Sequence, residues 1–138
     1  TDVDASWNYI HHNTARNVSI GYNDQMSGWG NRWEFNKVDS YRQYGMGFRL
    51  MDATLAQPSK ASSTNGPIVR CNVATNPIGS TTKALGVGGM MNATFSSNTL
   101  PFIWISKNAS TYWSKFGNTW NGSTVLPGKN PPLSSAGC

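Results

Sequence analysis

Short stretches of alternating apolar and polar residues recur along this chain, with turn-forming residues between them. Such alternation places every second side chain on the same side of an extended backbone, which is typical of β-strands. The pattern predicts strands near residues 7–12, 17–22, 32–37, 45–52, 68–73, 90–95 and 101–106. The last of these is the most apolar, and Pro101 at its start fits a position where a strand tolerates a missing N–H donor.

Glycine, asparagine and serine mark the segments between the predicted strands. Pairs typical of tight turns occur at residues 27–28, 30–31, 65–66, 117–118 and 121–122. Residues 110–116 predict one short helix, whereas 57–66 and 76–82 predict loops. We detect no internal repeat. Short strands at close intervals therefore predict an all-β fold, a single-domain antiparallel sandwich or flattened barrel with at most one or two short helices.

The two cysteines bear on domain organisation and compartment. The chain of 138 residues is long enough for one domain with a single core, which we assign to residues 1–125. Residues 126–138 form a Pro- and Ser-rich tail of the same domain, ending in Cys138. Terminal residues fray unless something holds them, so we expect a Cys71–Cys138 disulfide to fasten this tail. The alternatives are two unrelated thiols or a bond from Cys138 to another chain.

Composition favours an extracellular protein. Charged residues make up only 12% of the chain, so amides, hydroxyls and glycines must cover much of its surface. A disulfide would also indicate an oxidising compartment. The chain begins at Thr1 without a signal-peptide pattern, so we expect a mature or truncated product that is secreted or displayed at the cell surface. No apolar run is long enough to span a bilayer.

Acidic residues are confined to the first part of the chain. Up to Asp52 there are six acidic and five basic residues, whereas the rest carries six basic residues and no acidic side chain. Carboxylates are the usual general acids, bases and metal ligands, so such chemistry would draw on Asp24, Glu34, Asp39 or Asp52. Metal-binding motifs are absent, and we expect no cofactor and no metal. The basic residues are dispersed, which does not favour a nucleic-acid partner.

The adjacent histidines offer little catalytic potential in a strand. Alternation predicts that His11 and His12 point to opposite faces, so one small site could not use both. The sequence also lacks the G-x-S-x-G motif of many serine hydrolases. We therefore favour binding over catalysis and predict no catalytic residue. A small secreted hydrolase that uses His11 or His12 stays an alternative.

The sixteen aromatic residues provide the clearest candidates for a binding site. They fall into two groups along the chain, and residues 49–94 contain none. We assign some to the core: Trp33, Phe35, Phe48, Phe102 and Trp104. Exposed indole and phenol rings beside amides suit sugar faces or membrane interfaces, because each ring joins an apolar plane to a polar edge. The predicted ligand-binding residues are Trp29, Tyr41, Tyr44, Trp113 and Trp120.

These features predict an adhesin- or lectin-like module that recognises a glycan or an acidic surface ligand through aromatic rings and amides. One alternative is a structural subunit of a pilus, filament or virion, where low charge and many amides would serve self-association. Another is a membrane-active toxin. The spacing of Trp7, Ile10, Asn13 and Gly28-Trp29-Gly30 resembles the opening strands of aegerolysins, a cytolysin family. The acidic and cysteine-containing motifs of that family do not follow, so we infer no membership.

Overall fold

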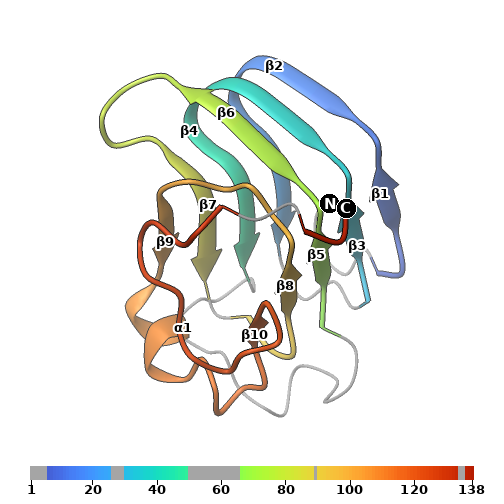
Figure 1. Ribbon diagram of the computed structural model, residues 1–138, viewed down its shortest axis with the longest axis vertical. Helices are drawn as coiled ribbons and strands as arrows, with labels where there is room; N and C mark the ends of the chain where they lie inside the picture. The colour runs from blue at the N-terminus through green and yellow to red at the C-terminus, as the bar shows by residue number, and fades with distance from the viewer. Residues whose placement is uncertain (1–5, 26–29, 50–65, 89, 134–135) are drawn as a thin grey trace.

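A computed structural model describes residues 6–25, 30–49, 66–88, 90–133 and 136–138 (Figure 1). These residues form short strands, two long strands and one short helix. The strands are β1 (Tyr9–His11), β2 (Thr14–Gln25), β3 (Arg32–Glu34), β4 (Lys37–Arg49), β5 (Ile68–Arg70), β6 (Val73–Pro77), β7 (Lys83–Gly88), β8 (Thr94–Ser96), β9 (Ile103–Ile105) and β10 (Thr119–Trp120), and the helix is α1 (Lys107–Thr111). No helix in the described part of the chain is long and apolar enough to cross a membrane.

The strands form two parallel sheets, which we call sheet A and sheet B. Sheet A has the order β1-β3-β5-β8-β10, and sheet B has the order β2-β4-β7-β9 with β6 also paired to β4. Successive strands alternate between the two sheets, except that β6 and β7 both lie in sheet B and pair with β4. Strands that are paired in space are therefore one circuit apart in sequence (Figure 1). This path is that of a parallel β-solenoid, in which each coil packs on the previous one.

The predicted antiparallel sandwich or flattened barrel is therefore wrong, although the chain is mostly β as expected. Every strand pairing in both sheets is parallel. Apolar alternation identifies the two faces of a strand, but it carries no information about the direction of the neighbouring strand. Parallel neighbours need a long crossover, which is often a helix, whereas here a strand of the opposite sheet provides it.

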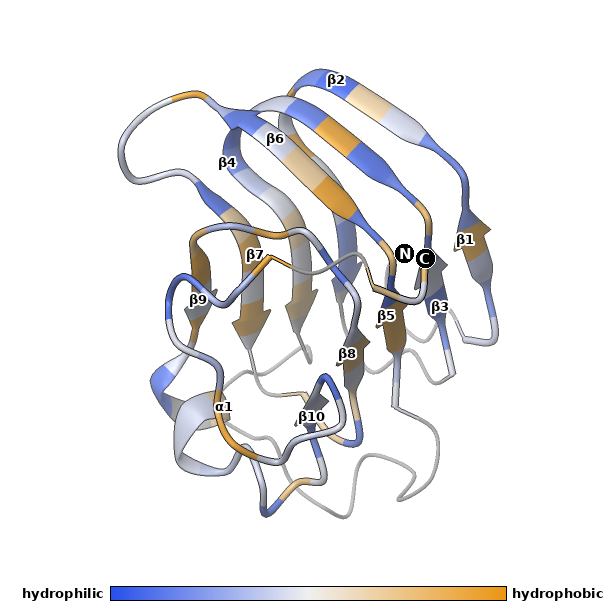
Figure 2. Ribbon diagram, in the orientation of Figure 1, coloured by the Kyte–Doolittle hydropathy of each residue, from blue (hydrophilic) through white to orange (hydrophobic). Residues whose placement is uncertain are grey.

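The core consists of rows of side chains that point inward from both sheets. Strand register aligns one row along sheet A, comprising Ile10, Trp33, Val69, Phe95 and Trp120. Phe95 is fully buried, and its ring centroid lies 6.0 Å from that of Phe48 in sheet B and 5.6 Å from that of Trp120. Figure 2 shows the underlying alternation of apolar and polar residues along β4 and β6. The prediction that Trp33 and Phe48 belong to the core is confirmed, whereas Phe35 and Phe102, predicted with them, are only half-buried.

One turn recurs in successive coils and joins sheet A to sheet B. Each copy has a residue with positive φ followed by asparagine, at His12-Asn13, Phe35-Asn36, Cys71-Asn72 and Ser97-Asn98. The asparagine side chains form a ladder, with each Nδ2 donating to the Oδ1 of the next at 3.0–3.1 Å. The expectation of no internal repeat is thus wrong. The insertions between these turns differ in length, which hides the repeat in the sequence.

The predicted disulfide is confirmed. Cys71 and Cys138 are bonded, with their Cα atoms 5.6 Å apart. Cys71 lies in the recurring turn after β5, so the bond fastens the chain end to the side of the solenoid (Figure 1). The Oγ of Ser97, in the same turn of the next coil, donates to the main-chain oxygen of Ala136 at 2.6 Å.

Candidate functional site

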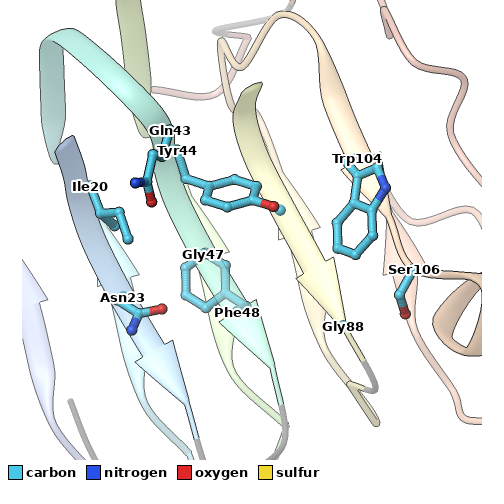
Figure 3. Close-up of a pocket in the computed structure, with 10 residues that line it drawn as sticks. Ile20, Asn23, Gln43, Tyr44, Gly47, Phe48, Gly88, Trp104 and Ser106 are labelled. Carbon is cyan, nitrogen blue, oxygen red and sulfur yellow. The ribbon is translucent and has the colours of Figure 1, made fainter. Parts of the chain in front are cut away.

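A groove of about 360 Å³ lies on the outer face of sheet B, across the second halves of β2 and β4 and across β7 and β9 (Figure 3). Its floor follows one row of the strand register: Asn23, Gly47, Gly86 and Trp104. Two of the four positions on this row are glycines, which carry no side chain. The groove therefore exists because outward side chains are missing in the middle of the sheet.

The two glycines let neighbouring side chains lie close to the sheet. A Cβ atom at Gly86 would come within 2.6 Å of Cε1 of Tyr44, so the Tyr44 ring occupies the space above this glycine. A Cβ atom at Gly47 would come within 3.1 Å of Oδ1 of Asn23. Glycine is thus required at position 86 for the observed position of the tyrosine ring.

Two aromatic side chains flank the groove. Tyr44 extends from β4 toward β7 and, beyond it, Trp104 on β9 (Figure 3). Trp104 is 43% exposed, although it lies between the inward-pointing Ile103 and the half-buried Ile105. The prediction that Trp104 belongs to the core is therefore wrong. Its strand is apolar on both faces, and only the tertiary structure shows that the outer face is left open.

Polar groups surround the aromatic pair. The side chains of Asn23, Gln43 and Ser106 contribute amide and hydroxyl groups to the lining. The Nζ atom of Lys83 lies 5.7 Å from the centroid of the Tyr44 ring and places a positive charge at this end of the groove. The described lining contains no carboxylate, histidine or cysteine. This set of groups can bind a ligand by stacking and hydrogen bonding, but it offers no general acid, base or nucleophile of those types.

Of the predicted ligand-binding residues, only Tyr44 lies in this groove. Tyr41, Trp113 and Trp120 are buried in the core, with exposed fractions of 0%, 2% and 8%. Burial also raises the pKa of Tyr41 to about 12. A ligand at the protein surface cannot reach these three rings. Trp29 lies outside the described residues.

Sequence reasoning missed Trp104, Ile20, Asn23 and Gln43 as lining residues. The available signal was the alternation Ile103-Trp104-Ile105, in which the middle residue must face away from its neighbours. Gly47 and Gly86 were a second signal, because glycine within a strand often marks a place where another group approaches closely. That these positions lie side by side follows only from the parallel register.

A second group of side chains, which we call the sheet A cluster, covers the outer face of β1, β3 and β5. It comprises Tyr9, His11, His12, Arg32, Glu34, Phe35 and Arg70. At its centre the Glu34 side chain is 1% exposed. Arg32 donates from Nη2 and Nε to Oε1 of Glu34 at 2.8 and 3.1 Å. Tyr9 and Arg70 donate to Oε2 at 3.0 and 3.2 Å.

These contacts explain the ionisation of Glu34. Burial by itself would raise the pKa of this carboxyl group, because it disfavours the charged form. The hydrogen bonds from Arg32 and Tyr9 and the charges of Arg32 and Arg70 outweigh burial and hold the pKa below its usual value. Glu34 is thus a charged group with both oxygens engaged, which indicates a structural role.

The prediction that His11 and His12 point to opposite faces is wrong. Their Nδ1 atoms lie 2.9 Å apart on the exterior of the protein. The strand ends at His11, and His12 has a φ of 54°, so the chain turns there and the strict alternation stops. Phe35 occupies the same position of the next coil, with a φ of 56°, and its ring stacks on that of His12.

The other carboxylates named from the sequence do not join this cluster. Asp24 is buried and accepts hydrogen bonds from Nδ2 of Asn31 and, at 2.9 Å, from Nε1 of Trp33. Asp39 accepts hydrogen bonds from the side chains of Thr75 and Asn76 at the surface. Asp52 lies outside the described residues. In the described part of the chain, no group of three or more His, Cys, Asp or Glu side chains is placed to hold a metal ion.

No family model, curated protein or solved structure matches this chain. The fold and the groove on sheet B therefore define it by architecture alone, as a parallel β-solenoid with an aromatic surface groove.

Proposed function

We propose that this protein is an extracellular or surface-displayed binding module that recognises a glycan through the groove on sheet B. The observation that carries this proposal is that two aromatic side chains, Tyr44 and the exposed Trp104, line the same groove (Figure 3). The Tyr44 ring lies over Gly86. A pyranose ring has an apolar face that stacks on aromatic rings, and its hydroxyl groups bond to amides. Asn23 and Gln43 supply such amides within the same groove.

The charge near the groove favours a glycan with acidic groups. Lys83 lies beside the Tyr44 ring, and the chain as a whole has a net charge of +5. Opposite charge speeds association and favours an acidic partner over a neutral one. We therefore propose uronic or sialic acid units among the sugars that bind. The disulfide is compatible with the oxidising environment in which such glycans occur.

A glycan array followed by calorimetric titration tests this proposal. Trp104→Ala and Tyr44→Ala should each weaken binding at least about ten-fold, equivalent to about 1.4 kcal/mol, because each removes one stacking face. Tyr112→Ala provides a matched control, since Tyr112 is also exposed but lies outside the groove. Absence of binding to every acidic and neutral glycan, or equal binding by all variants, would overturn the proposal.

A second candidate function, self-assembly, has separate support at the first coil. In the described residues β2 pairs only with β4, and β1 pairs only with β3, so both sheets end there. An unpaired strand edge offers N–H and C=O groups to a strand of another chain. We propose that a second copy could continue the solenoid at this end, as a filament subunit would.

Sedimentation at increasing protein concentration tests self-assembly. If copies add at β2, the mass should rise with concentration, and Ser19→Lys should reduce this rise because a charge on an edge strand opposes pairing. Ser80→Lys is the control, since Ser80 lies in the turn between β6 and β7. A monomer at all concentrations would rule out assembly and leave glycan binding untouched.

A further inference from the structure

His11 and His12 are the only histidines of this chain, and the fold brings their Nδ1 atoms to 2.9 Å on an exposed surface. Two neutral imidazoles at this distance share one proton, with one Nδ1–H donating to the lone pair of the other Nδ1. The same two lone pairs could instead bind one metal ion. The groove on sheet B does not include these residues, so this site is independent of the proposed glycan binding.

The positions of both rings are set by contacts beneath and beside them. The His11 ring stacks on Tyr9, with centroids 4.1 Å apart, and the His12 ring stacks on Phe35 at 4.9 Å. Nδ2 of Asn13 donates to the main-chain oxygen of His11 at 2.9 Å and supports the turn. Because these contacts are already present, little side-chain entropy is left to lose when a ligand binds.

The distance between the nitrogens fits one coordination geometry better than another. Imidazole nitrogens bind divalent transition-metal ions at about 2.0–2.1 Å. Two such nitrogens that subtend about 90° at the metal are therefore about 2.9 Å apart, whereas a tetrahedral angle would separate them by about 3.3–3.4 Å. The observed 2.9 Å matches adjacent positions of a square-planar or octahedral ion. Square-planar and tetragonal nitrogen sites are typical of Cu²⁺ and Ni²⁺.

We propose that His11 and His12 chelate a divalent ion of this kind, Cu²⁺ most strongly, through their Nδ1 atoms. Binding displaces the shared proton from Nδ1, and the same ring takes up a proton at Nε2 from solvent, so the neutral pair releases no net proton. Both oxygens of Glu34 are engaged by Arg32, Arg70 and Tyr9, and so this carboxylate is not a third ligand. The remaining coordination positions stay open to water or to a donor group of a binding partner.

The content of histidine and cysteine in this chain makes the test unusually clean. Because both cysteines form the disulfide, no free thiol competes for the metal ion. Because the chain has two histidines, replacing both removes every imidazole. The experiment titrates the tag-free full chain with Cu²⁺ and with Ni²⁺ by calorimetry, and records the electron paramagnetic resonance spectrum of the Cu²⁺ form. We expect one ion per chain, Cu²⁺ bound more tightly than Ni²⁺, and hyperfine coupling to two nitrogens.

The variants are chosen to keep the backbone unchanged. His12→Asn introduces a residue that tolerates positive φ. Ser40→Asn introduces the same residue at another position with positive φ, 61°, and serves as the control. We expect His11→Asn and His12→Asn each to weaken Cu²⁺ binding at least about ten-fold, the minimum that loss of even a supporting hydrogen bond costs in metal sites. Ser40→Asn should bind as the wild type does. Equal Cu²⁺ affinity in the wild type and in folded His11→Asn/His12→Asn, or a spectrum without nitrogen coupling, would overturn the proposal.

Discussion

Asn72 and Asn98 are joined by two hydrogen bonds to a single oxygen. The main-chain N–H of Asn72 donates to Oδ1 of Asn98 at 2.9 Å, and Nδ2 of Asn72 donates to the same atom at 3.0 Å. Asn36 is bonded to Asn72 in the same way, at 3.0 and 3.1 Å. All three residues are buried, so the ladder satisfies polar groups that water cannot reach. It also supports the turns whose preceding residues have positive φ.

Replacing the central residue of this ladder should strongly destabilise the fold. Asn72→Ala leaves Asn36 N–H and the main-chain oxygen of Trp33 without these partners, and each such buried group costs about 1–3 kcal/mol. We expect the free energy of unfolding in denaturant to fall by about 2–4 kcal/mol. The exposed Asn130→Ala is the control and should change it little. A loss no larger than in the control would contradict the structural role of the ladder.

The buried carboxylate of the sheet A cluster should make stability depend on acidic pH. Because folding lowers the pKa of Glu34 from its ordinary 4.5, the folded state binds this proton less readily than the unfolded chain. The ionised Glu34 therefore contributes fully to folding stability above that ordinary pKa. This contribution is lost as the pH falls through the lower pKa of the folded state.

Glu34→Gln isolates this contribution. We expect the free energy of unfolding at pH 7 to fall by about 1–2 kcal/mol, in the lower part of the range for hydrogen bonds to charged groups. The loss is small because the side chains of Arg32 and Arg70 are nearly half exposed, so solvent screens their charges. The difference from the wild type should shrink in thermal unfolding below pH 4. Asp39→Asn, on the surface, serves as control. A difference that stays constant from pH 7 to acid would show that charge is not the cause.

Removal of the disulfide should weaken the fold without changing its core. Cys138→Ser frees the chain end, and the loss of a crosslink that closes so long a loop costs about 2–4 kcal/mol. In reductant, the free energy of unfolding of the wild type should fall to that of Cys138→Ser. Reductant should not change the free energy of unfolding of the variant. Denaturant unfolding with and without reductant measures both. A further loss of stability in the reduced variant would point to a different effect of the reductant.

A methyl group on the groove floor should disturb binding more than stability. In Gly86→Ala the new Cβ atom would lie 2.6 Å from the Tyr44 ring, which must then move away from the sheet. We expect glycan affinity to fall about ten-fold, or about 1.4 kcal/mol. Gly128→Ala is the matched control, because nothing lies within 4 Å of its Cβ position. Unchanged affinity in the Gly86 variant would show that the ring position does not matter for the ligand.

The buried hydroxyl of Tyr41 should be dispensable. Among the described residues it has no hydrogen-bond partner, and such a group loses its contacts with water without replacement. Tyr41→Phe should therefore leave stability unchanged or raise it by about 1 kcal/mol in denaturant unfolding. Phe48→Leu provides a contrast, since it replaces a buried ring by a smaller aliphatic side chain and should destabilise the fold. A clear loss in Tyr41→Phe would reveal a partner for the hydroxyl group.

Several local features follow from the sequence because they depend on neighbouring residues alone. The alternation in 32–37 identifies a strand with Trp33 inward, although the strand ends at Glu34 and Phe35 stacks on His12 outside it. The disulfide is different, because it joins residues 67 positions apart and is indicated only by the number and positions of the cysteines. The helix is found earlier than predicted, at Lys107–Thr111 rather than 110–116. This shift arises because the chain continues through turns to Gly117, where the sequence pattern resembles a helix end.

The site could not be predicted because it is made of residues from different coils. Tyr44 and Trp104 are sixty positions apart, and only the parallel register of β4, β7 and β9 places them on one face. The same register aligns Gly47 with Gly86 and opens the groove. Similarly, the positive φ of His12 joins two histidines that strict alternation would separate.

The sequence by itself thus determined that this chain is rich in strands and low in charge, because these properties reside in short segments or in composition. It predicted the disulfide, and the structure decided between that bond and its two alternatives. Only the tertiary structure decided that the strands run parallel, that the asparagines form a ladder and that Trp104 rather than Trp113 faces solvent. The physical reason is that strand direction and register depend on contacts one coil away. Insertions of unequal length between the coils conceal those contacts in the sequence.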